Sequence, residues 1–258
     1  MTTQPDSSTL SLAERLGVLA MTATVQTVSP LSPSLSSVTL RVPDTAIGGV
    51  PGNDVMISVP KPEGGLARRR YSVRSVDTEA STVTFWITTH HDGFASEWLR
   101  DAQVGAQTDL VGPRGKVKLE PLADWYLFVG DISALGAFYN LAEAIEIPGK
   151  AIFVVEVPTA DDIVTTSFDE GLGVTGIFIE RQGREANDPE GLLRGLAALE
   201  FPEGEGHVYL FGEFKQINAV KIALLDRGIT LEQISMKAFW RQGKANQDHG
   251  EPDKTPEL

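Results

Sequence analysis

The sequence contains no cysteine, and this absence removes several classes of protein from consideration. Disulfide bonds, thiolate metal sites and iron–sulfur clusters bound by this chain are excluded, because each needs cysteine sulfur. Histidine is scarce as well, with four residues among 258. The adjacent His90 and His91 would point to opposite faces of a strand and chelate a metal poorly. We therefore expect no metal site, and an electron-transfer function would need an organic cofactor.

Basic residues and long apolar runs are also in short supply. Lys and Arg total 22 against 35 Asp and Glu, which gives a net charge of −13. Nucleic acids and anionic membranes attract basic surfaces, so neither is an expected partner. The longest apolar stretch near the N-terminus, residues 17–21, is too short for a signal core, and no run approaches the length of a membrane span. The missing signal and the missing cysteine together predict a cytoplasmic location.

The chain divides into four parts by its hydrophobic pattern. Residues 1–24 form an N-terminal segment with a short helix. Residues 25–122 carry short Val, Thr and Ile-rich strands broken by Gly and Pro turns, which is typical of a sandwich or barrel. In residues 123–245, apolar runs alternate with helical stretches, which predicts a parallel sheet with crossovers. Residues 246–258 are rich in Pro, Glu, Asp and Lys and are predicted to be disordered.

Local signals place the expected elements. Ser11 to Glu14 match a capping box, and Leu12, Leu16 and Leu19 share one helical face, so the N-terminal helix is predicted there. The expected strands of the second half are residues 125–129, 151–157, 176–180 and 208–211. The expected helices are residues 134–147, 189–199 and 214–227, the last ending before a glycine.

The most informative short motif is Arg-Arg-Tyr-Ser-Val-Arg at residues 69–74. Alternate side chains of a strand share a face, so Arg69, Tyr71 and Val73 are expected on one side. A guanidinium there can hold a phosphate while the phenol ring lies against a planar heterocycle. An ordinary basic strand on a solvated face is the alternative that so short a motif leaves open.

A second motif follows an expected strand at residues 82–90. Residues 93–96 predict a turn that opens a short helix, whose free N–H groups and positive dipole end suit a diphosphate. Ser96 can add a hydroxyl, although a plain helix cap is the favoured interpretation of this residue alone. A third segment, residues 105–115, predicts a turn, a strand and a closing Gly-Pro-Arg-Gly turn.

Together these segments resemble the siderophore-interacting protein family, flavin-dependent ferric-siderophore reductases within the ferredoxin-reductase-like superfamily. The similarity extends from about Val25 to Gly243. It rests on six ordered motifs at residues 69–74, 90–98, 112–115, 130–136, 212–213 and 239–240. The sequence departs from the family pattern at Phe94, Ile132, Ser133, Gly136 and Phe239. The departures within residues 130–136 bear on nicotinamide use more than on flavin binding.

The resemblance implies a fold, a cofactor and a set of cofactor contacts. The fold is an N-terminal antiparallel FAD-binding β-barrel followed by a smaller, Rossmann-like parallel α/β domain that binds a nicotinamide. The cofactor is FAD, and NADH or NADPH is the expected reductant. The expected FAD contacts are Arg69, Tyr71, Ser72, Val73, His90, Gly93, Ala95, Ser96 and Trp98.

Two Gly-acid pairs come where predicted core strands end, which is where open α/β sheets bind ligands. With Arg181 they make up the expected nicotinamide residues, Gly130, Asp131, Gly212, Glu213 and Arg181. Without the resemblance, a tight turn with a helix-capping acid is the better interpretation of both pairs. Arg181 and Arg184 follow an expected strand and can pair with the 2′-phosphate of NADPH, but solvated loop cations are the favoured interpretation.

The implied function is the reduction of Fe(III) in a ferric siderophore, which is the expected partner. A flavin couples a two-electron donor to a one-electron acceptor, and oxygen ligands hold the resulting Fe(II) more weakly. No protein acid or base is needed, so no catalytic residue is expected. A ferredoxin is an alternative donor. Two other functions stay open: a general flavin reductase or ferredoxin-linked electron carrier, and a non-enzymatic siderophore-binding flavoprotein.

An acidic protein needs a local basic surface to receive anionic ferric chelates. The expected substrate residues are Lys237, Trp240, Arg241 and Lys244. Lys237 and Arg241 are four residues apart and would share a face on a strand or on a helix. Trp240 would supply an aromatic wall. A core Phe239-Trp240 pair with solvated cations at its rim is an equal alternative.

Overall fold

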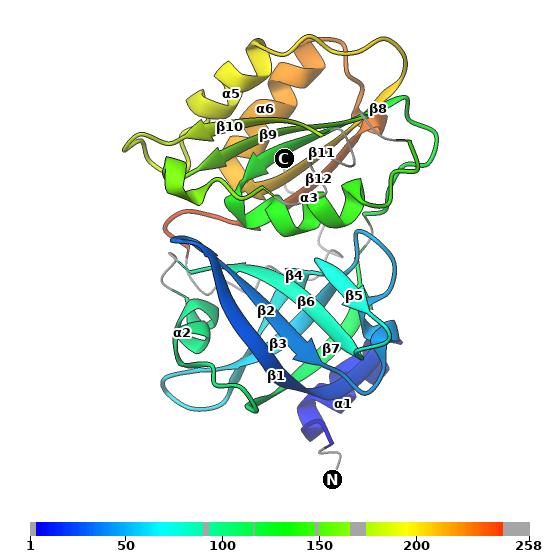
Figure 1. Cartoon of the computed structure of the whole chain (residues 1–258), viewed down its shortest axis with the longest axis vertical. Helices are drawn as coiled ribbons and strands as arrows, with labels where there is room; N and C mark the ends of the chain where they lie inside the picture. Colours follow the sequence, from blue (N-terminus) through cyan, green and yellow to red (C-terminus); the bar gives the residue numbers. More distant parts are fainter. Residues whose placement is uncertain (1–3, 90–92, 116, 148–149, 166–173, 245–258) are drawn as a thin grey trace.

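The computed structural model forms two stacked parts, a curled antiparallel sheet below and a helix-covered parallel sheet above (Figure 1). The structure describes residues 4–89, 93–115, 117–147, 150–165 and 174–244. His90 and the predicted disordered tail therefore lie outside the described residues. None of the described helices has the length and apolarity that a membrane crossing requires.

The N-terminal helix begins earlier than the sequence pattern indicates. Helix α1 (Ser7–Leu16) is capped by Asp6, whose carboxylate accepts from the backbone N–H of Ser8 at 2.8 Å. The prediction of a capping box at Ser11 is thus wrong. The helix already begins at Ser7, where Asp6 satisfies its first N–H groups, and Ser11 lies inside the helix. The helix ends at Gly17, and Leu19 belongs to the first strand instead.

The N-terminal domain is a curled seven-stranded sheet. Its strands are β1 (Leu19–Ser32), β2 (Leu35–Arg41), β3 (Asp54–Pro60), β4 (Leu66–Ser72), β5 (Ser75–Asp77), β6 (Thr82–Thr88) and β7 (Gln107–Arg114). They run antiparallel in the order β4-β3-β7-β1-β2-β6-β5. A 3-10 turn η1 (Thr45–Gly48) joins β2 to β3, and helix α2 (Phe94–Asp101) packs at the side of the sheet (Figure 1). Alternate Val, Leu and Phe side chains fill its interior.

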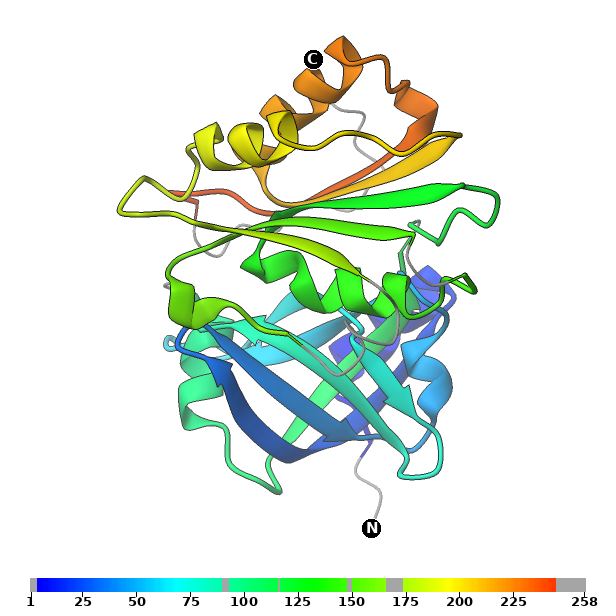
Figure 2. The ribbon, with the colours of Figure 1, turned by 45° about the horizontal axis from the view of Figure 1, so that its top comes forward.

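The second domain has a smaller, five-stranded sheet, and all its strands are parallel. They are β8 (Trp125–Asp131), β9 (Ala151–Val157), β10 (Thr175–Glu180), β11 (Gly206–Glu213) and β12 (Ile234–Trp240), in the order β10-β9-β8-β11-β12. Helix α3 (Leu135–Ala142) covers the face toward the barrel, and α5 (Glu190–Ala197) and α6 (Phe214–Asp226) cover the other (Figure 2). Short 3-10 turns η2 (Ile132–Ala134), η3 (Ala160–Asp162) and η4 (Leu231–Gln233) precede or follow these elements.

The expected alternation of strands and helices is confirmed, with one helix shorter than predicted. The helix expected over residues 134–147 ends at Ala142. Ile147 precedes a proline, and a residue in that position is pushed away from helical backbone angles. The edge strand β12 was not expected as a strand from the residues, because its apolar and polar side chains do not form a continuous buried run.

Helix α3 is the main contact between the two domains. A Cβ built on Gly136 would lie 3.0 Å from Trp86 of the barrel, so only a very small residue fits. The Trp86 and Tyr139 rings meet edge to face at 5.5 Å. Asn140 accepts from the N–H of Gly52 at 2.9 Å and donates to the carbonyl of Arg74 at 3.2 Å. The departure from the family pattern at Gly136 thus has a packing explanation.

A buried ion pair reinforces this interface. Arg74 is 6% exposed, and both of its terminal nitrogens donate to the carboxylate of Glu143, one of them at 2.8 Å. Its guanidinium also lies 4.9 Å from the Trp86 ring centroid and 5.4 Å from that of Tyr139. The last arginine of the 69–74 motif is therefore an interdomain contact.

The tip of the β1–β2 hairpin makes a second interdomain contact. Asp162 is buried and accepts from Ser32 Oγ at 2.9 Å, from the N–H of Ser34 at 2.8 Å and from Thr159 Oγ1 at 3.0 Å. Burial alone would raise the pKa of Asp162, but these hydrogen bonds outweigh it and lower the pKa. The hairpin and the loop after β9 are thereby fixed to each other.

We expect Arg74→Ala to lower the free energy of unfolding by about 3 to 5 kcal/mol, because it leaves the Glu143 carboxylate without its partner at a buried interface. Urea unfolding followed by tryptophan fluorescence measures this change. Arg41→Ala, at an exposed position of β2, is the matched control and should stay within about 0.5 kcal/mol of the wild type. Equal losses in the two variants would contradict a stabilising role of the pair.

Candidate functional site

The predicted flavin motif, residues 69–74, begins on β4 and faces the start of helix α2. The guanidinium of Arg69 is 5.5 Å from the ring centroid of Phe94, the first residue of that helix. Tyr71, Phe94 and Trp98 are half-buried and pack against the interior of the barrel. The structure therefore brings a cation and three aromatic rings to one place from two separate segments.

The start of α2 has the features of an anion site. Gly93 is the N-cap residue with an extended backbone, and no described side chain caps this end. The first N–H groups of a helix have no partner within the helix, and the dipole makes this end positive. A phosphate is stabilised in such a position, particularly beside a guanidinium. The eight-residue helix and Arg69 together fit the diphosphate of FAD.

Ser96 has a different contact from the one expected. It is 4% exposed, and its hydroxyl donates to the carbonyl of Thr88 at 3.2 Å. Because Gly93 is the N-cap residue, the interpretation of Ser96 as a plain helix cap is wrong. The hydroxyl ties α2 to the end of β6, and Ala95 beside it packs into the barrel core.

The three consecutive arginines of β4 have three different partners. Arg68 donates to Ser8 of α1 at 2.6 Å, and Arg70 Nε lies 3.4 Å from Asp54 Oδ1. Only Arg69 contacts α2. Alternation along the strand explains the division, since neighbouring side chains point to opposite faces.

Tyr71, Ser72 and Val73 form the rest of the motif. Burial raises the pKa of the Tyr71 hydroxyl, so the phenol is neutral at physiological pH and suits contact with a flavin ring. Ser72 pairs with Asp54 across β3 and β4. Val73 is 2% exposed, and its side chain belongs to the barrel core. A flavin contact of Val73 would therefore involve its backbone.

The second group of predicted residues lies at the carboxyl end of the parallel sheet. Asp131 is 1% exposed and accepts from three groups: the N–H of Ser133 at 2.8 Å, the N–H of Glu213 at 2.7 Å and Trp240 Nε1 at 3.0 Å. Glu213 caps α6 by accepting from the N–H of Lys215 and Gln216. The interpretation of both acids as helix caps is confirmed.

The two glycines beside these acids are required by the packing of β8 against β11. A Cβ on Gly130 would lie 1.8 Å from the carbonyl oxygen of Phe211. Gly212 has φ +134°, and its Cβ would lie 2.5 Å from the Asp131 carboxylate. The strand ends approach so closely that a side chain at either position would displace backbone.

Arg181 and Arg184 are held by one buried carboxylate. Arg181 Nε lies 3.0 Å from Glu156 Oε1, and Arg184 Nη2 lies 3.3 Å from Oε2. Burial raises the pKa of Glu156, and the hydrogen bonds and charges of Gln216 and both arginines act in the opposite direction. The interpretation of the arginines as solvated loop cations is wrong, because their side chains are only 11% and 18% exposed. The missed signal was an acid inside the apolar run of β9.

The predicted substrate residues contact different parts of the molecule. Lys237 pairs with Asp54 of the barrel, whereas the guanidinium of Arg241 lies 4.9 Å from the ring of Phe214 on α6. The prediction that Lys237 and Arg241 share a face fails, because β12 ends at Trp240 and its pairing with β11 shifts register there. Lys244 is exposed.

Asp54 is a functional candidate that the sequence did not reveal. It is fully buried, contacts Arg70 and Lys237, and lies opposite Ser72 of the flavin motif. Burial lowers the pKa of Lys237, and the charge of Asp54 acts against that shift. Through this pair, β12 of the second domain contacts β3, the strand next to β4.

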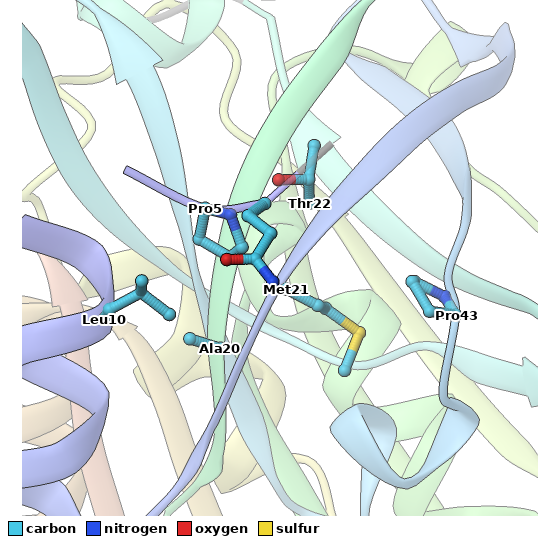
Figure 3. A pocket seen from close by; sticks show the side chains of 7 residues that line it. Pro5, Leu10, Ala20, Met21, Thr22 and Pro43 are labelled. Atoms are coloured by element: carbon cyan, nitrogen blue, oxygen red, sulfur yellow. The ribbon is translucent and has the colours of Figure 1, made fainter. Parts of the chain in front are cut away.

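A hollow of about 270 Å³ lies elsewhere, between the N-terminal segment and β1 (Figure 3). Its lining consists of Gln4, Pro5, Leu10, Ala20, Met21, Thr22 and Pro43. No lining side chain is charged, so it offers nothing that would hold a diphosphate.

Comparison with known proteins places the two halves of the chain in one family. The family model for a siderophore-interacting FAD-binding domain matches residues 51–117, and the model for a siderophore-interacting protein matches residues 123–243. The ferric vibriobactin reductase ViuB of Vibrio cholerae is 26% identical over 195 residues, 74% of this chain and 70% of that protein. An uncharacterised protein of Mycobacterium tuberculosis is 28% identical over 190 residues, which span 69% of this chain and 66% of that protein.

Solved structures support the same assignment. A siderophore utilization protein from T. fusca superposes with a TM-score of 0.76 at 27% identity, covering 90% of this chain and 96% of that one. The siderophore-interacting protein SipS from Aeromonas hydrophila superposes with a TM-score of 0.74 at 23% identity, and the match covers 87% of this chain and 92% of that one. The ferredoxin reductase of carbazole 1,9a-dioxygenase shares the fold, with a TM-score of 0.71 at 22% identity. This match covers 86% of this chain and 70% of that one. With family matches to both domains and this fold, the chain belongs to the siderophore-interacting protein family.

Proposed function

We propose that this chain is an FAD-dependent reductase of ferric siderophores that converts chelated Fe(III) to Fe(II) and so releases iron. The observation that carries the proposal is the meeting of Arg69, the N-terminal end of α2 and the half-buried Tyr71 and Trp98, within a family of siderophore-interacting proteins. ViuB, a ferric vibriobactin reductase that is 26% identical to this chain, supports the same reaction.

Bound FAD would supply the chemistry, taking a hydride from a two-electron donor and passing single electrons to the iron. The chain's own residues would bind and orient it. Arg69 and the N–H groups after Gly93 would hold the diphosphate, and the neutral Tyr71 and Trp98 would flank the ring. Ser72, Val73, His90, Ala95 and Ser96 complete the proposed FAD contacts.

The donor is proposed to be NADH or NADPH, bound at the carboxyl edge of the parallel sheet beside Gly130, Asp131, Gly212, Glu213 and Arg181. Open α/β sheets bind ligands at this edge. The contact between Lys237 and Asp54, opposite Ser72, supports electron delivery here, because it brings the second domain against the flavin strand. A reduced ferredoxin is the alternative donor.

The ferric chelate is proposed to approach the basic residues around β12, which are Lys237, Trp240, Arg241 and Lys244. The net charge of −13 repels an anionic chelate at long range, so a local positive field is needed. Lys237 is best placed for this because it lies beside the flavin strand.

We expect Arg69→Ala to weaken FAD binding by about tenfold or more, because a charge-assisted contact to a phosphate contributes about 1.5 to 3 kcal/mol. Titration of apoprotein with FAD, followed by quenching of flavin fluorescence, measures the dissociation constant. Arg68→Ala removes a neighbouring cation that contacts α1 instead, and its affinity should stay within about threefold of the wild type. Wild-type affinity in Arg69→Ala would refute the assignment.

The reaction itself has a direct optical test. The FAD-loaded protein should be yellow, bleach anaerobically with NADH or NADPH, and regain its colour when a ferric siderophore is added. Stopped-flow absorbance with each nicotinamide and with reduced ferredoxin identifies the donor. Free flavin as acceptor is the control, because a general flavin reductase would be reoxidised by it at least as fast as by the chelate. Reduced protein that no ferric chelate reoxidises would rule out the reductase.

The substrate surface predicts a dependence on salt. The screening length falls from about 30 Å at 0.01 M to about 10 Å at 0.1 M, so docking of an anionic chelate on cations should slow across this range. The measured quantity is the dependence of the reoxidation rate constant on salt concentration. We expect a Lys237/Arg241/Lys244 triple-Ala variant to lose most of this dependence. A neutral ferric chelate is the control acceptor. Identical salt slopes in the two proteins would exclude these residues as the docking site.

A further inference from the structure

A buried charge cluster lies at the carboxyl end of β9, beside the edge proposed for the nicotinamide. Glu156 is fully buried and pairs with Asp131 in the register of β8 and β9. Its Oε1 accepts from Arg181 Nε at 3.0 Å and from Gln216 Nε2 at 2.8 Å, and its Oε2 accepts from Arg184 Nη2 at 3.3 Å. One carboxylate thus engages both of the arginines that follow β10.

Arg184 is held by further bonds. Arg184 Nε donates to the carbonyl of Arg181 at 2.9 Å, and its Nη2 donates to the carbonyl of Glu180 at 3.2 Å. A Cβ on Gly191, in the first turn of α5, would lie 2.5 Å from Arg184 Nη2 and 2.6 Å from Glu156 Oε2. Helix α5 therefore closes over the cluster, and Arg184 cannot turn outward without losing all of these contacts.

The charge around the cluster is negative. Residues 180–190 carry four acids, Glu180, Glu185, Asp188 and Glu190, against the two arginines. Glu156 adds a further carboxylate inside the fold. A phosphate dianion brought here meets like charge, whereas a sugar hydroxyl is neutral and can donate to a carboxylate.

We propose that Glu156 makes this chain select NADH over NADPH, by holding Arg181 and Arg184 away from the ribose 2′ position. The inference rests on the proposed function, because it names the nicotinamide for the same site. An arginine near the ribose accommodates the 2′-phosphate of NADPH in dinucleotide-binding folds, and an acid there favours the free hydroxyl. Glu156 is a positioning residue that acts through the arginines. It favours NADH because it denies NADPH the cations that the 2′-phosphate needs.

The test compares two half-molecules of the nicotinamides on the FAD-loaded protein. Isothermal titration should show that the wild type binds 5′-AMP more tightly than 2′,5′-ADP. Glu156→Gln keeps the shape of the side chain and releases the arginines, so its affinity for 2′,5′-ADP should rise by about tenfold or more while that for 5′-AMP changes by less than about threefold. Arg181→Ala added to Glu156→Gln should remove most of the gain.

Glu180→Gln is the matched control. It removes the same charge from the neighbouring strand β10 at an exposed position, and it should leave the ratio of the two affinities within about twofold. A gain in Glu180→Gln equal to that in Glu156→Gln would overturn the inference, because general charge would then explain the effect. Stopped-flow reduction of the flavin should move in parallel, with the NADPH to NADH rate ratio rising only in Glu156→Gln.

Other outcomes are equally decisive. A wild type that binds 2′,5′-ADP as tightly as 5′-AMP, or more tightly, overturns the inference without any variant, even where Glu156→Gln fails to fold. Binding of neither ligand overturns it together with the nicotinamide donor. The reductase proposal is judged separately, by reoxidation of dithionite-reduced protein with a ferric siderophore. A shifted ligand preference in Glu156→Gln supports the inference even where that reoxidation fails.

Discussion

Carboxylates buried at the ends of strands need cations or hydrogen-bond donors as partners, and much of this structure is arranged around that requirement. A buried unpaired carboxylate costs several kcal/mol, so each must gather cations or N–H groups. Asp54, Asp131, Glu156 and Glu213 are all at most 1% exposed. Each lies at the end of a strand, and each joins segments that are distant in the chain. These carboxylates therefore find their partners within the chain itself.

This requirement also couples the two domains. Asp54 at the start of β3 contacts Lys237 from β12, and Asp162 after β9 holds the hairpin tip at Ser32. Arg74 and Glu143 form a third contact between the domains. Here the barrel supplies the cation and the second domain supplies the carboxylate. A flavin between the domains would be held by the barrel and approached from the second sheet.

The same network limits which groups the carboxyl edge of the parallel sheet can offer to a ligand. Asp131 and Glu213 already accept from the chain's own N–H groups, and the arginines after β10 already have Glu156. A ligand at this edge would meet backbone, glycine and sugar-compatible acids more readily than free cations.

The sequence by itself determined the order of the elements along the chain. Alternation in residues 69–74, the helix start at Gly93 and the strand–helix periodicity after residue 123 are local patterns, and the barrel, the parallel sheet and their order are confirmed. Local pattern failed where the deciding partner lay far along the chain. Nothing near Arg74 indicates Glu143, nothing near Arg181 indicates Glu156, and nothing in β12 indicates that Lys237 would contact Asp54. Only the tertiary structure decided these pairings, because a charged side chain is assigned its role by the group that packing brings opposite it, and that group is set by how the two sheets stack.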